Sequence, residues 1–387
     1  SAGPWQPFRS KAAWVAPRRA PAAAYRAAGR AGLQMDGGAG DPLRAKRQIS
    51  TLSASSVLGE LDAIQYTNMP LDGDLYGFAL KSFARDVFVM QHQGVSRARV
   101  VRLICAISLL WINVGVQAWL MIEIRCYITG KTVREIRDVY DDFQAHMYGD
   151  DEAHFFLSPN GNRRGLPEFF RPDLFENLDE SIKTGVCQIP LSRPCLLGVI
   201  LFIWSLHCVA DIKRGADLLA CVLALDTGSK GYIRLHHQSG EEEDSAVSVE
   251  SFSASAKGAI CVFIFLPRLL VNFVLLWLGC RWLVATFSFE DLVLNGCALA
   301  FIKETKDLLF DTLVSAWNKR ELELTSIEVP SRTEQSSTWA FSRTYLWGVA
   351  TFAFVVLYMT CFQQVLPDYN WDVRGVCNVW IAENYFP

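Results

Sequence analysis

The sequence predicts an all-α integral membrane protein with about four transmembrane helices and one amphipathic helix that is interfacial or re-entrant. Hydrophobic residues make up 51% of the 387-residue chain and charged residues only 20%, below the roughly 25% of an average soluble domain. The apolar residues are gathered in long runs that polar stretches separate. The net charge of −3 provides no broad basic surface. We therefore expect the lipid bilayer, and no nucleic acid, as a partner.

Four apolar runs are long enough to cross a bilayer, because its hydrocarbon core of about 30 Å needs about 20 residues of helix. These predicted spans are residues 103–122, 194–210, 259–285 and 345–362. The second ends sharply at Asp211, and the fourth carries small residues that allow close helix approach. With four spans, both termini would lie on the same side of the membrane.

The third span contains ionisable residues, which inside a membrane are by default a functional hypothesis. Arg268 and Arg281 lie roughly 20 Å apart along a helix axis, so each guanidinium could snorkel to its own interface. The alternative is a buried role for Arg268 inside the bundle, and both interpretations stay open. Pro267 then marks a kink within the helix and not its end.

Residues 288–317 predict the amphipathic helix. Ser288 followed by Asp291 is typical of a helix N-cap, and apolar side chains recur at helical spacing with charges between them. The apolar first half is too short to cross the membrane, which favours an interfacial or re-entrant helix. The first-turn acids Glu290 and Asp291 have two interpretations: they stabilise the N-terminal end of the helix, or they line an ion entrance.

The domain organisation follows from these shifts in composition. We expect a disordered segment at residues 1–50, a polar or amphipathic region at 51–99, the multi-pass membrane domain at 100–365 and a tail at 366–387. Residues 1–35 are rich in arginine and lack acids, as an organelle transit peptide does. The alternative is translated untranslated sequence, with Met35 as the start.

Three polar segments separate the spans. Residues 123–193 form an acidic loop whose first helix has an apolar stripe that would pack on the membrane domain. The acids and histidines between Asp141 and His154 match no calcium-loop spacing, so we interpret them as a solvated turn. Residues 226–257, with His236, His237 and an acidic run, and residues 318–340 predict flexible linkers.

No catalytic, cofactor or metal site is predicted, and the chain is not expected to be an enzyme. It has no nucleophile elbow, metalloprotease helix, P-loop or dinucleotide motif, and its cysteines lack the spacing of a zinc site. Cys187 and Cys377 are the only pair we consider for a disulfide, because they lie in polar segments. In the four-span topology they lie on opposite sides of the membrane, so that topology predicts no bond.

Three stretches of the membrane domain carry recognisable motifs: CLLGVILFIWSLHCVADIKR, LPRLLVNFVLLWLGCRWLVATFSFEDLVLNGCALAFIKETKDLLFDTL and FAFVVLYMTCFQQVLP. The first is a Trp-containing span that ends in an acidic-basic cluster, and the second is a span that runs into an ATxSFEDLxxN-type segment. The residues that carry these motifs are Trp204, Asp211, Lys213 and Arg214, then Ala285, Thr286, Ser288, Phe289, Glu290, Asp291, Leu292 and Asn295.

Over roughly residues 100–365 the chain resembles a large family of uncharacterised multi-pass membrane proteins of marine protists, particularly dinoflagellates. In that family, the helix that begins at the ATxSFEDLxxN-type segment usually continues with a pair of acidic residues before a Leu-Leu sequence. This chain departs from that pattern with Lys303-Glu304-Thr305-Lys306-Asp307, which removes support for a cation site built from the pair. The resemblance implies no known activity.

Two functions of different classes are compatible with the sequence. The first is a channel or transport component, in which Glu290, Asp291 and Asn295 line a polar entrance and Arg268 faces the bundle interior. The second is a non-enzymatic membrane scaffold or sensor that binds partners through the loop at 123–193, which the apparent absence of paired intramembrane charges favours. Either function allows a homo-oligomer, and the sequence leaves open whether the membrane is that of an organelle or the plasma membrane.

Overall fold

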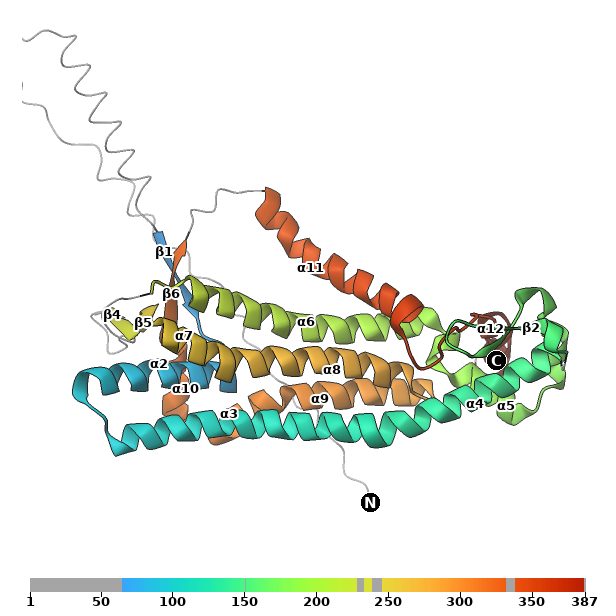
Figure 1. Cartoon of the computed structure of the whole chain (residues 1–387), viewed down its shortest axis with the longest axis horizontal. Coiled ribbons are helices and arrows are strands. Elements are labelled where there is room, and N and C mark those ends of the chain that lie inside the picture. Colours follow the sequence, from blue (N-terminus) through green and yellow to red (C-terminus); the bar gives the residue numbers. More distant parts are fainter. Residues whose placement is uncertain (1–64, 150, 228–232, 239–245, 332–337, 386–387) are drawn as a thin grey trace, which may run out of the picture. The chain divides into compact units, whose positions relative to one another are not determined.

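The computed structural model describes residues 65–149, 151–227, 233–238, 246–331 and 338–385. The predictions for residues 1–50, for Met35 and for the acidic run at 241–244 lie outside these residues. The described part of the chain is mainly helical, and its long helices α3, α6, α8 and α9 pack side by side (Figure 1).

Four helices of the described part are long and apolar enough to cross a membrane, and they coincide with the four predicted spans. The first is α3 (Arg97–Glu123), which continues through the π-helical turn η1 (Ile124–Ile128) into α4 (Thr129–Tyr148), and the second is α6 (Pro194–Ala224). The third is one continuous helix made of α7 (Ala254–Ile260), η6 (Cys261–Phe265) and α8 (Leu266–Val284). The fourth is α11 (Thr338–Leu357) with η7 (Tyr358–Phe362). Pro267 is the second residue of α8, shortly after the π-helical turn η6. The helix continues through it, so Pro267 does not end the span, as predicted.

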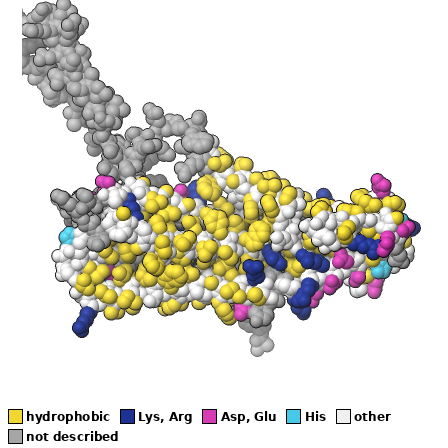
Figure 2. All heavy atoms as spheres, viewed as in Figure 1, with side chains coloured by type: hydrophobic (Ala, Val, Ile, Leu, Met, Phe, Trp, Pro, Cys, Tyr) yellow, Lys and Arg dark blue, Asp and Glu magenta, His cyan; other side chains and the backbone are white. Residues whose placement is uncertain are grey.

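The outward faces of these helices are apolar. Val199 and Ile203 on α6 are 57% and 61% exposed. Figure 2 shows hydrophobic side chains over much of the bundle on one face, while charged side chains gather over the region of α4 and α5. An exposed apolar surface of this kind is unfavourable in water and is the surface that lipid chains would cover.

The amphipathic helix differs from its prediction. α9 (Phe289–Leu313) is one continuous helix that packs along α8, α3 and α6 (Figure 1). Its first residue, Phe289, contacts Arg193 at the start of α6, with the guanidinium 5.6 Å from the ring. Its last turns reach α2 (Leu75–Gln93), where the rings of Phe310 and Phe78 lie 6.4 Å apart. α9 therefore runs along the bundle, and two charged residues of its second half, Lys303 and Lys306, are buried in the interior.

The two predicted linkers contribute to a sheet that the all-α prediction lacks. In the described residues, four strands pair in the order β1 (Gln65–Pro70), β6 (Thr325–Ser331), β5 (Ala246–Phe252) and β4 (Ile233–Gln238). β5 and β6 are parallel, and the two outer pairs are antiparallel. The strands come from three distant segments, and α10 (Ala316–Glu323) precedes β6. The all-α prediction missed this sheet because each strand is short and is stabilised only by partner strands that are distant in the sequence.

The loop at 123–193 and the C-terminal tail fold together into a unit that we call the cap. The cap contains α4, the hairpin β2 (Phe155–Leu157) and β3 (Arg163–Gly165), α5 (Glu180–Gln188) and α12 (Val373–Tyr385), joined by the 3₁₀ turns Glu152–His154, Pro167–Phe169, Pro172–Asn177 and Pro190–Ser192. The predicted apolar stripe of α4, from Val133 to Met147, is buried in it. A disulfide joins Cys187 on α5 to Cys377 on α12.

The disulfide contradicts the prediction that the four-span topology excludes this bond. α6 begins beside the cap and ends beside the sheet, and α9 returns the chain along the same bundle. The loop at 123–193 and the tail therefore meet at one end of the helices. The first described strand, β1, lies at the other end of the helices, beside the sheet.

Candidate functional site

The N-terminus of α2 lies inside the bundle and brings two acids with it. Asp74 caps the helix, and its Oδ1 accepts a hydrogen bond from the backbone N–H of Gly77 at 2.9 Å. The turn that leads to the cap is tight, because a Cβ on Gly77 would lie 2.0 Å from the carbonyl oxygen of Asp72. Glycine at this position therefore allows Asp72 and Asp74 to enter the core together.

Arg268 meets these acids from α8 and is 1% exposed. Its Nη2 lies 2.7 Å from Oδ2 of Asp72 and 3.5 Å from Oδ2 of Asp74. The guanidinium lies 5.2 Å from the ring of Tyr76, within the range of a cation–π contact. The side chain packs against Gly215 of α6. Of the two interpretations of this arginine, the structure supports the buried one, since the side chain does not snorkel.

Asp211 supplies a third carboxylate from α6 and is 1% exposed. Its Oδ2 lies 3.1 Å from Nζ of Lys303 and 3.2 Å from Nζ of Lys306. The two lysines occupy one face of α9 at the i, i+3 spacing. Lys306 also lies 3.3 Å from Oδ2 of Asp74, so it joins the two halves of the arrangement. We call Asp72, Asp74, Asp211, Arg268, Lys303 and Lys306 the ion-pair cluster.

A chain of neutral polar groups leads from α3 to the same region. Asn113 and Gln117 are buried and lie one turn apart, and the Asn113 amide donates to the side-chain oxygen of Gln117 at 3.3 Å. The Gln117 amide donates to the backbone carbonyl of Ile302 at 3.1 Å. These groups connect the middle of the apolar helix α3 to the turn of α9 that carries Lys303.

Some nitrogen atoms near the cluster are buried without a hydrogen-bond partner among the described residues. They include Nε and Nη1 of Arg268 and Nε2 of His207, which lies one turn before Asp211 on α6. Buried N–H donors are normally satisfied, often by an ordered water or a ligand. Polar capacity therefore remains for water or a small ion beside the paired charges.

The predicted site residues on α9 lie elsewhere. The Ser288 hydroxyl donates to Asp291 at 2.8 Å and accepts from its backbone N–H at 3.1 Å, which is helix-capping geometry. The amide of Asn295 donates to the hydroxyl of Thr286 at 3.3 Å. Glu290, Asp291 and Asn295 belong to the first two turns of α9, at the end of the bundle where the cap unit lies. The α9 residues of the ion-pair cluster, Lys303 and Lys306, lie on its second half. The structure does not bring Glu290, Asp291 and Asn295 together with Arg268.

Of the six cluster residues, the sequence predicts only Arg268 as a site residue. Asp72 and Asp74 fall in the segment predicted to be polar or amphipathic, and Asp211 falls at the predicted end of a span. Lys303 and Lys306 lie where the chain departs from the family motif. The i, i+3 spacing of the two lysines places both on one face of α9. Because Glu304, Asp307 and Asp311 lie on the same half of the helix, this spacing does not distinguish a buried face from a solvated one.

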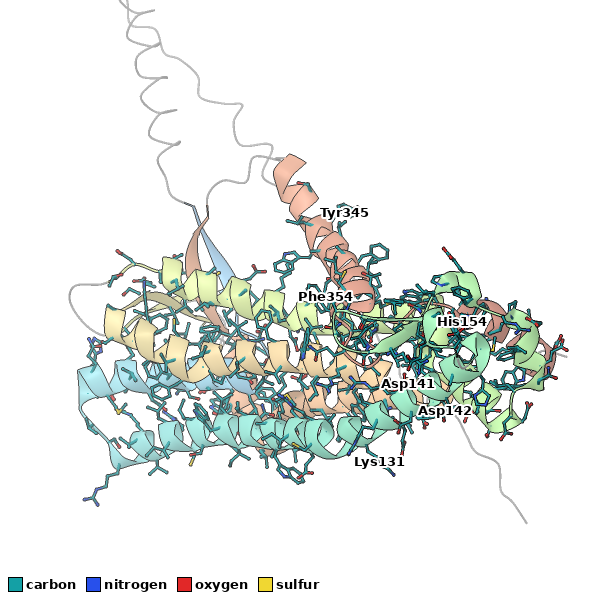
Figure 3. The ribbon with its side chains drawn as sticks, turned by 45° about the vertical axis from the view of Figure 1, so that its right-hand side comes forward. Lys131, Asp141, Asp142, His154, Tyr345 and Phe354 are labelled. Atoms are coloured by element: carbon teal, nitrogen blue, oxygen red, sulfur yellow. A yellow bond between two sulfur atoms is a disulfide. The ribbon has the colours of Figure 1, made fainter. Side chains whose placement is uncertain are left out.

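The acids and histidines between Asp141 and His154, which begin on the last turns of α4, make structural contacts in the described residues. Figure 3 shows Asp141 and Asp142 on α4 and His154 beyond its end. Asp141 pairs with Arg164 of β3 at 2.8 Å, and a ring nitrogen of His154 lies 2.7 Å from the carbonyl of Tyr148. Within the described residues, no group of three or more His, Cys, Asp or Glu side chains is arranged to hold a metal ion.

The described part of the chain is a helical bundle with the sheet at one end and the cap at the other, and the ion-pair cluster lies between them. No protein-family model, curated protein or solved structure matches it.

Proposed function

We propose that the protein is a multi-pass integral membrane protein that transports ions in a proton-linked manner, with the ion-pair cluster as its charge-carrying site. One observation supports the proposal most directly: in the described residues, three carboxylates and three cations are paired in the interior of a helical bundle whose outward faces are apolar. Asp211 lies near the middle of Pro194–Ala224, and Arg268 lies near the middle of Ala254–Val284. The cluster is therefore at mid-membrane depth if these helices span.

The energetics favour a functional role over simple packing. Removing two charges from water costs several kcal/mol per ion, and well-packed apolar residues of similar volume often stabilise a core better. Ionisable residues inside membrane segments accordingly concentrate in substrate and ion pathways and in proton relays. Here five charged side chains are almost fully buried in one place, and Asp72 is partly buried beside them. The N-terminus of α2, the positive end of its dipole, lies at Asp74, as helix N-termini do at transporter sites.

The shared partners suggest how the cluster would move charge. Asp74 lies between Arg268 and Lys306. Oδ2 of Asp211 lies between Lys303 and Lys306, and its Oδ1 pairs with the exposed Arg214 at 2.7 Å. Protonation of Asp211 would release both lysines from it, and Lys306 would then pair with Asp74 alone. Arg268 stays charged at any physiological pH, so it would hold Asp72 in place while the lysine pairs rearrange. Two arrangements related by one proton are the minimum that a proton-linked transporter requires.

The proposal is tested by flux measurements on purified protein in liposomes. A pH-sensitive dye would report proton movement, with sodium, potassium and chloride gradients applied in turn. We expect Asp211→Asn to reduce proton-linked flux at least tenfold. Asp311→Asn is the matched control, since this acid lies on the same bundle but is 71% exposed and pairs with Lys319 at the surface. It should retain wild-type flux.

A paired substitution separates function from folding. Asp211→Leu combined with Lys303→Met removes one negative and one positive charge and leaves Lys306 paired with Asp74. Replacing a buried ion pair with apolar residues of similar size is often neutral for stability. We expect the double variant to fold and to be inactive. Wild-type flux in a folded double variant would mean that the cluster is structural, and the proposal would be wrong.

The scaffold function remains the competing proposal, and one observation favours it. The cap is a folded, disulfide-linked unit that exposes several large apolar side chains, namely Phe156, Leu157 and Phe169 at 39%, 75% and 38%, which a protein partner would cover. Folded wild-type protein with no flux of any ion would leave this function in the lead.

A further inference from the structure

A groove of about 460 Å³ runs between α3 and α8 on the outside of the bundle. Its floor is formed by small or buried apolar side chains, among them Ala118 and Val271, and its rims carry Trp111 and Trp277. The groove is thus a concave apolar surface on the part of the molecule that faces lipid if α3 and α8 span the membrane.

One end of the groove is positively charged. Arg125, at the start of the π-helical turn that follows α3, and Arg281, in the last turn of α8, both line it. The Nε of Arg281 is buried and has no hydrogen-bond partner within the described residues. Among the described residues that line the groove there is no Asp or Glu. Two guanidinium groups at one end of an apolar groove are complementary to a molecule with an anionic head and an apolar tail.

The groove is long enough for a whole acyl chain. From Arg281 back to Val262, along the continuous helix of α7, η6 and α8, the axial rise is about 28 Å, and from Arg125 back to Trp111 along α3 it is about 21 Å. Both lengths exceed half of a hydrocarbon core, which is about 15 Å, and both arginines lie at the same end. An arginine at that end would lie at the level of lipid headgroups, where tryptophan and arginine side chains are favoured. The apolar part of the groove would then follow a single acyl chain toward the middle of the membrane.

We propose that this groove binds one anionic phospholipid, with its phosphate between Arg125 and Arg281 and an acyl chain along the floor beside Ala118. Guanidinium groups bind phosphate oxygens through paired hydrogen bonds. The aromatic rims would confine the acyl chain laterally. The inference rests on the membrane location that the proposed function assumes, but it does not depend on ion flux.

Native mass spectrometry of the full chain, released from nanodiscs of phosphatidylcholine with a minor fraction of phosphatidylglycerol, tests the proposal. We expect one retained phosphatidylglycerol per chain, enriched at least fivefold over its share of the nanodisc. The double variant Arg125→Gln and Arg281→Gln should lose this enrichment. Arg97→Gln is the matched control, because Arg97 is an exposed arginine at the opposite end of α3, and it should retain the lipid.

A second variant keeps the test informative if the arginine variant does not fold. Ala118→Leu fills the floor of the groove and leaves both arginines in place, so retention of phosphatidylglycerol should fall by a similar factor. Equal retention of both phospholipids by the wild type, or retention that Ala118→Leu and the arginine variant leave unchanged, would overturn the proposal. Displacement of the lipid by inorganic phosphate alone would also overturn it, since the acyl chain would then contribute nothing.

The lipid proposal and the transport proposal fail separately. Ion flux without lipid retention would contradict only the lipid proposal, and lipid retention without ion flux would contradict only the transport proposal.

Discussion

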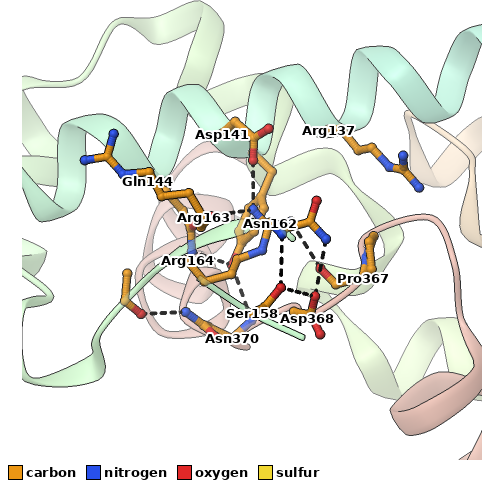
Figure 4. Close-up of polar contacts among 12 residues, drawn as sticks. Arg137, Asp141, Gln144, Ser158, Asn162, Arg163, Arg164, Pro367, Asp368 and Asn370 are labelled. Atoms are coloured by element: carbon orange, nitrogen blue, oxygen red, sulfur yellow. Dashed lines mark hydrogen bonds and ion pairs between the residues drawn. The ribbon is translucent and has the colours of Figure 1, made fainter. Parts of the chain in front are cut away.

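In the ion-pair cluster each carboxylate is held by cations, whereas in the cap two partly buried carboxylates are held by neutral donors. Asp372 accepts hydrogen bonds from the hydroxyls of Tyr140 and Tyr148, both at 3.0 Å. Asp368 accepts from the Ser158 hydroxyl at 2.6 Å and from the amides of Asn160 and Asn162. Figure 4 shows Asp368 among these loop residues, with Arg164 reaching Asp141 and the carbonyl of Pro367.

The difference indicates what each region does. Neutral donors fix a carboxylate in one position and leave it charged, which suits a contact that fastens the tail to the loop. Cations shared between carboxylates allow more than one pairing, and a single proton changes which pairing is favoured. We therefore interpret the contacts in the cap as structural, because they hold the C-terminal tail against the loop at 123–193. We interpret the ion-pair cluster as the place where charge could move.

The largest expected difference concerns the two fully buried arginines, Arg268 in the cluster and Arg164 in the cap. Arg268→Leu leaves Asp72 and Asp74 short of a cation, and breaking a buried pair costs about 3–5 kcal/mol. We expect reduced stability together with loss of flux. Arg164→Leu should also lower stability, but flux should persist in the protein that folds. Thermal unfolding and liposome flux, measured on both variants, check this; loss of flux in both would remove the functional distinction between the regions.

Removal of the disulfide should affect the cap alone. Cys377→Ser is expected to lower the free energy of unfolding of the cap by about 2–4 kcal/mol and to abolish the mobility difference between reduced and non-reduced protein on a gel. Cys361→Ser, which changes an exposed free cysteine of the neighbouring segment, is the control and should do neither. Flux should remain in Cys377→Ser at temperatures where the cap is folded. If it disappears there, the cap takes part in transport.

The entry of α2 into the cluster depends on one glycine. Gly77→Ala should destabilise the protein by about 1–3 kcal/mol, the usual range for forcing atoms into a packed core, because the new Cβ meets the Asp72 carbonyl. Gly73→Ala is the control, since a Cβ there meets nothing within 4 Å. We expect only the first variant to reduce flux, through displacement of Asp72 and Asp74. Denaturant unfolding and flux compare the two, and equal behaviour would show that the turn is not constrained as described.

The smallest effect is a pH dependence of the cap. Hydrogen bonds, first of all from Ser158, hold the pKa of Asp368 below its usual value. A lowered pKa in the folded state contributes stability that is complete above the pKa of the unfolded chain, about 3.9, and is lost as the pH falls through the folded value. Wild-type protein should therefore lose more thermal stability between about pH 6 and about pH 3 than Asp368→Asn does. Asparagine tolerates the left-handed conformation of this residue, φ 60°, so the variant adds no backbone strain. An equal loss in both proteins would contradict the assignment.

The sequence alone determined the local features of the chain. Long apolar runs predict membrane-length helices because a helix satisfies its own backbone in lipid, and Ser288 predicted the start of α9 because capping needs only neighbouring residues. The stripe from Val133 to Met147 predicted which face of α4 is buried, since helical periodicity requires no knowledge of the partner.

Tertiary structure decided everything that depends on a distant partner. Asp74 and Lys306 are separated by 232 positions, and no local pattern distinguishes a lysine that faces solvent from one that pairs inside a bundle. The same holds for β5, whose partners follow from where α6 and α10 end, and for Cys187, whose partner depends on α9 running the full length of the bundle. Charges, strand edges and cysteines acquire their role from what lies beside them, because their energies depend on the pairing and the local dielectric more than on the residue itself.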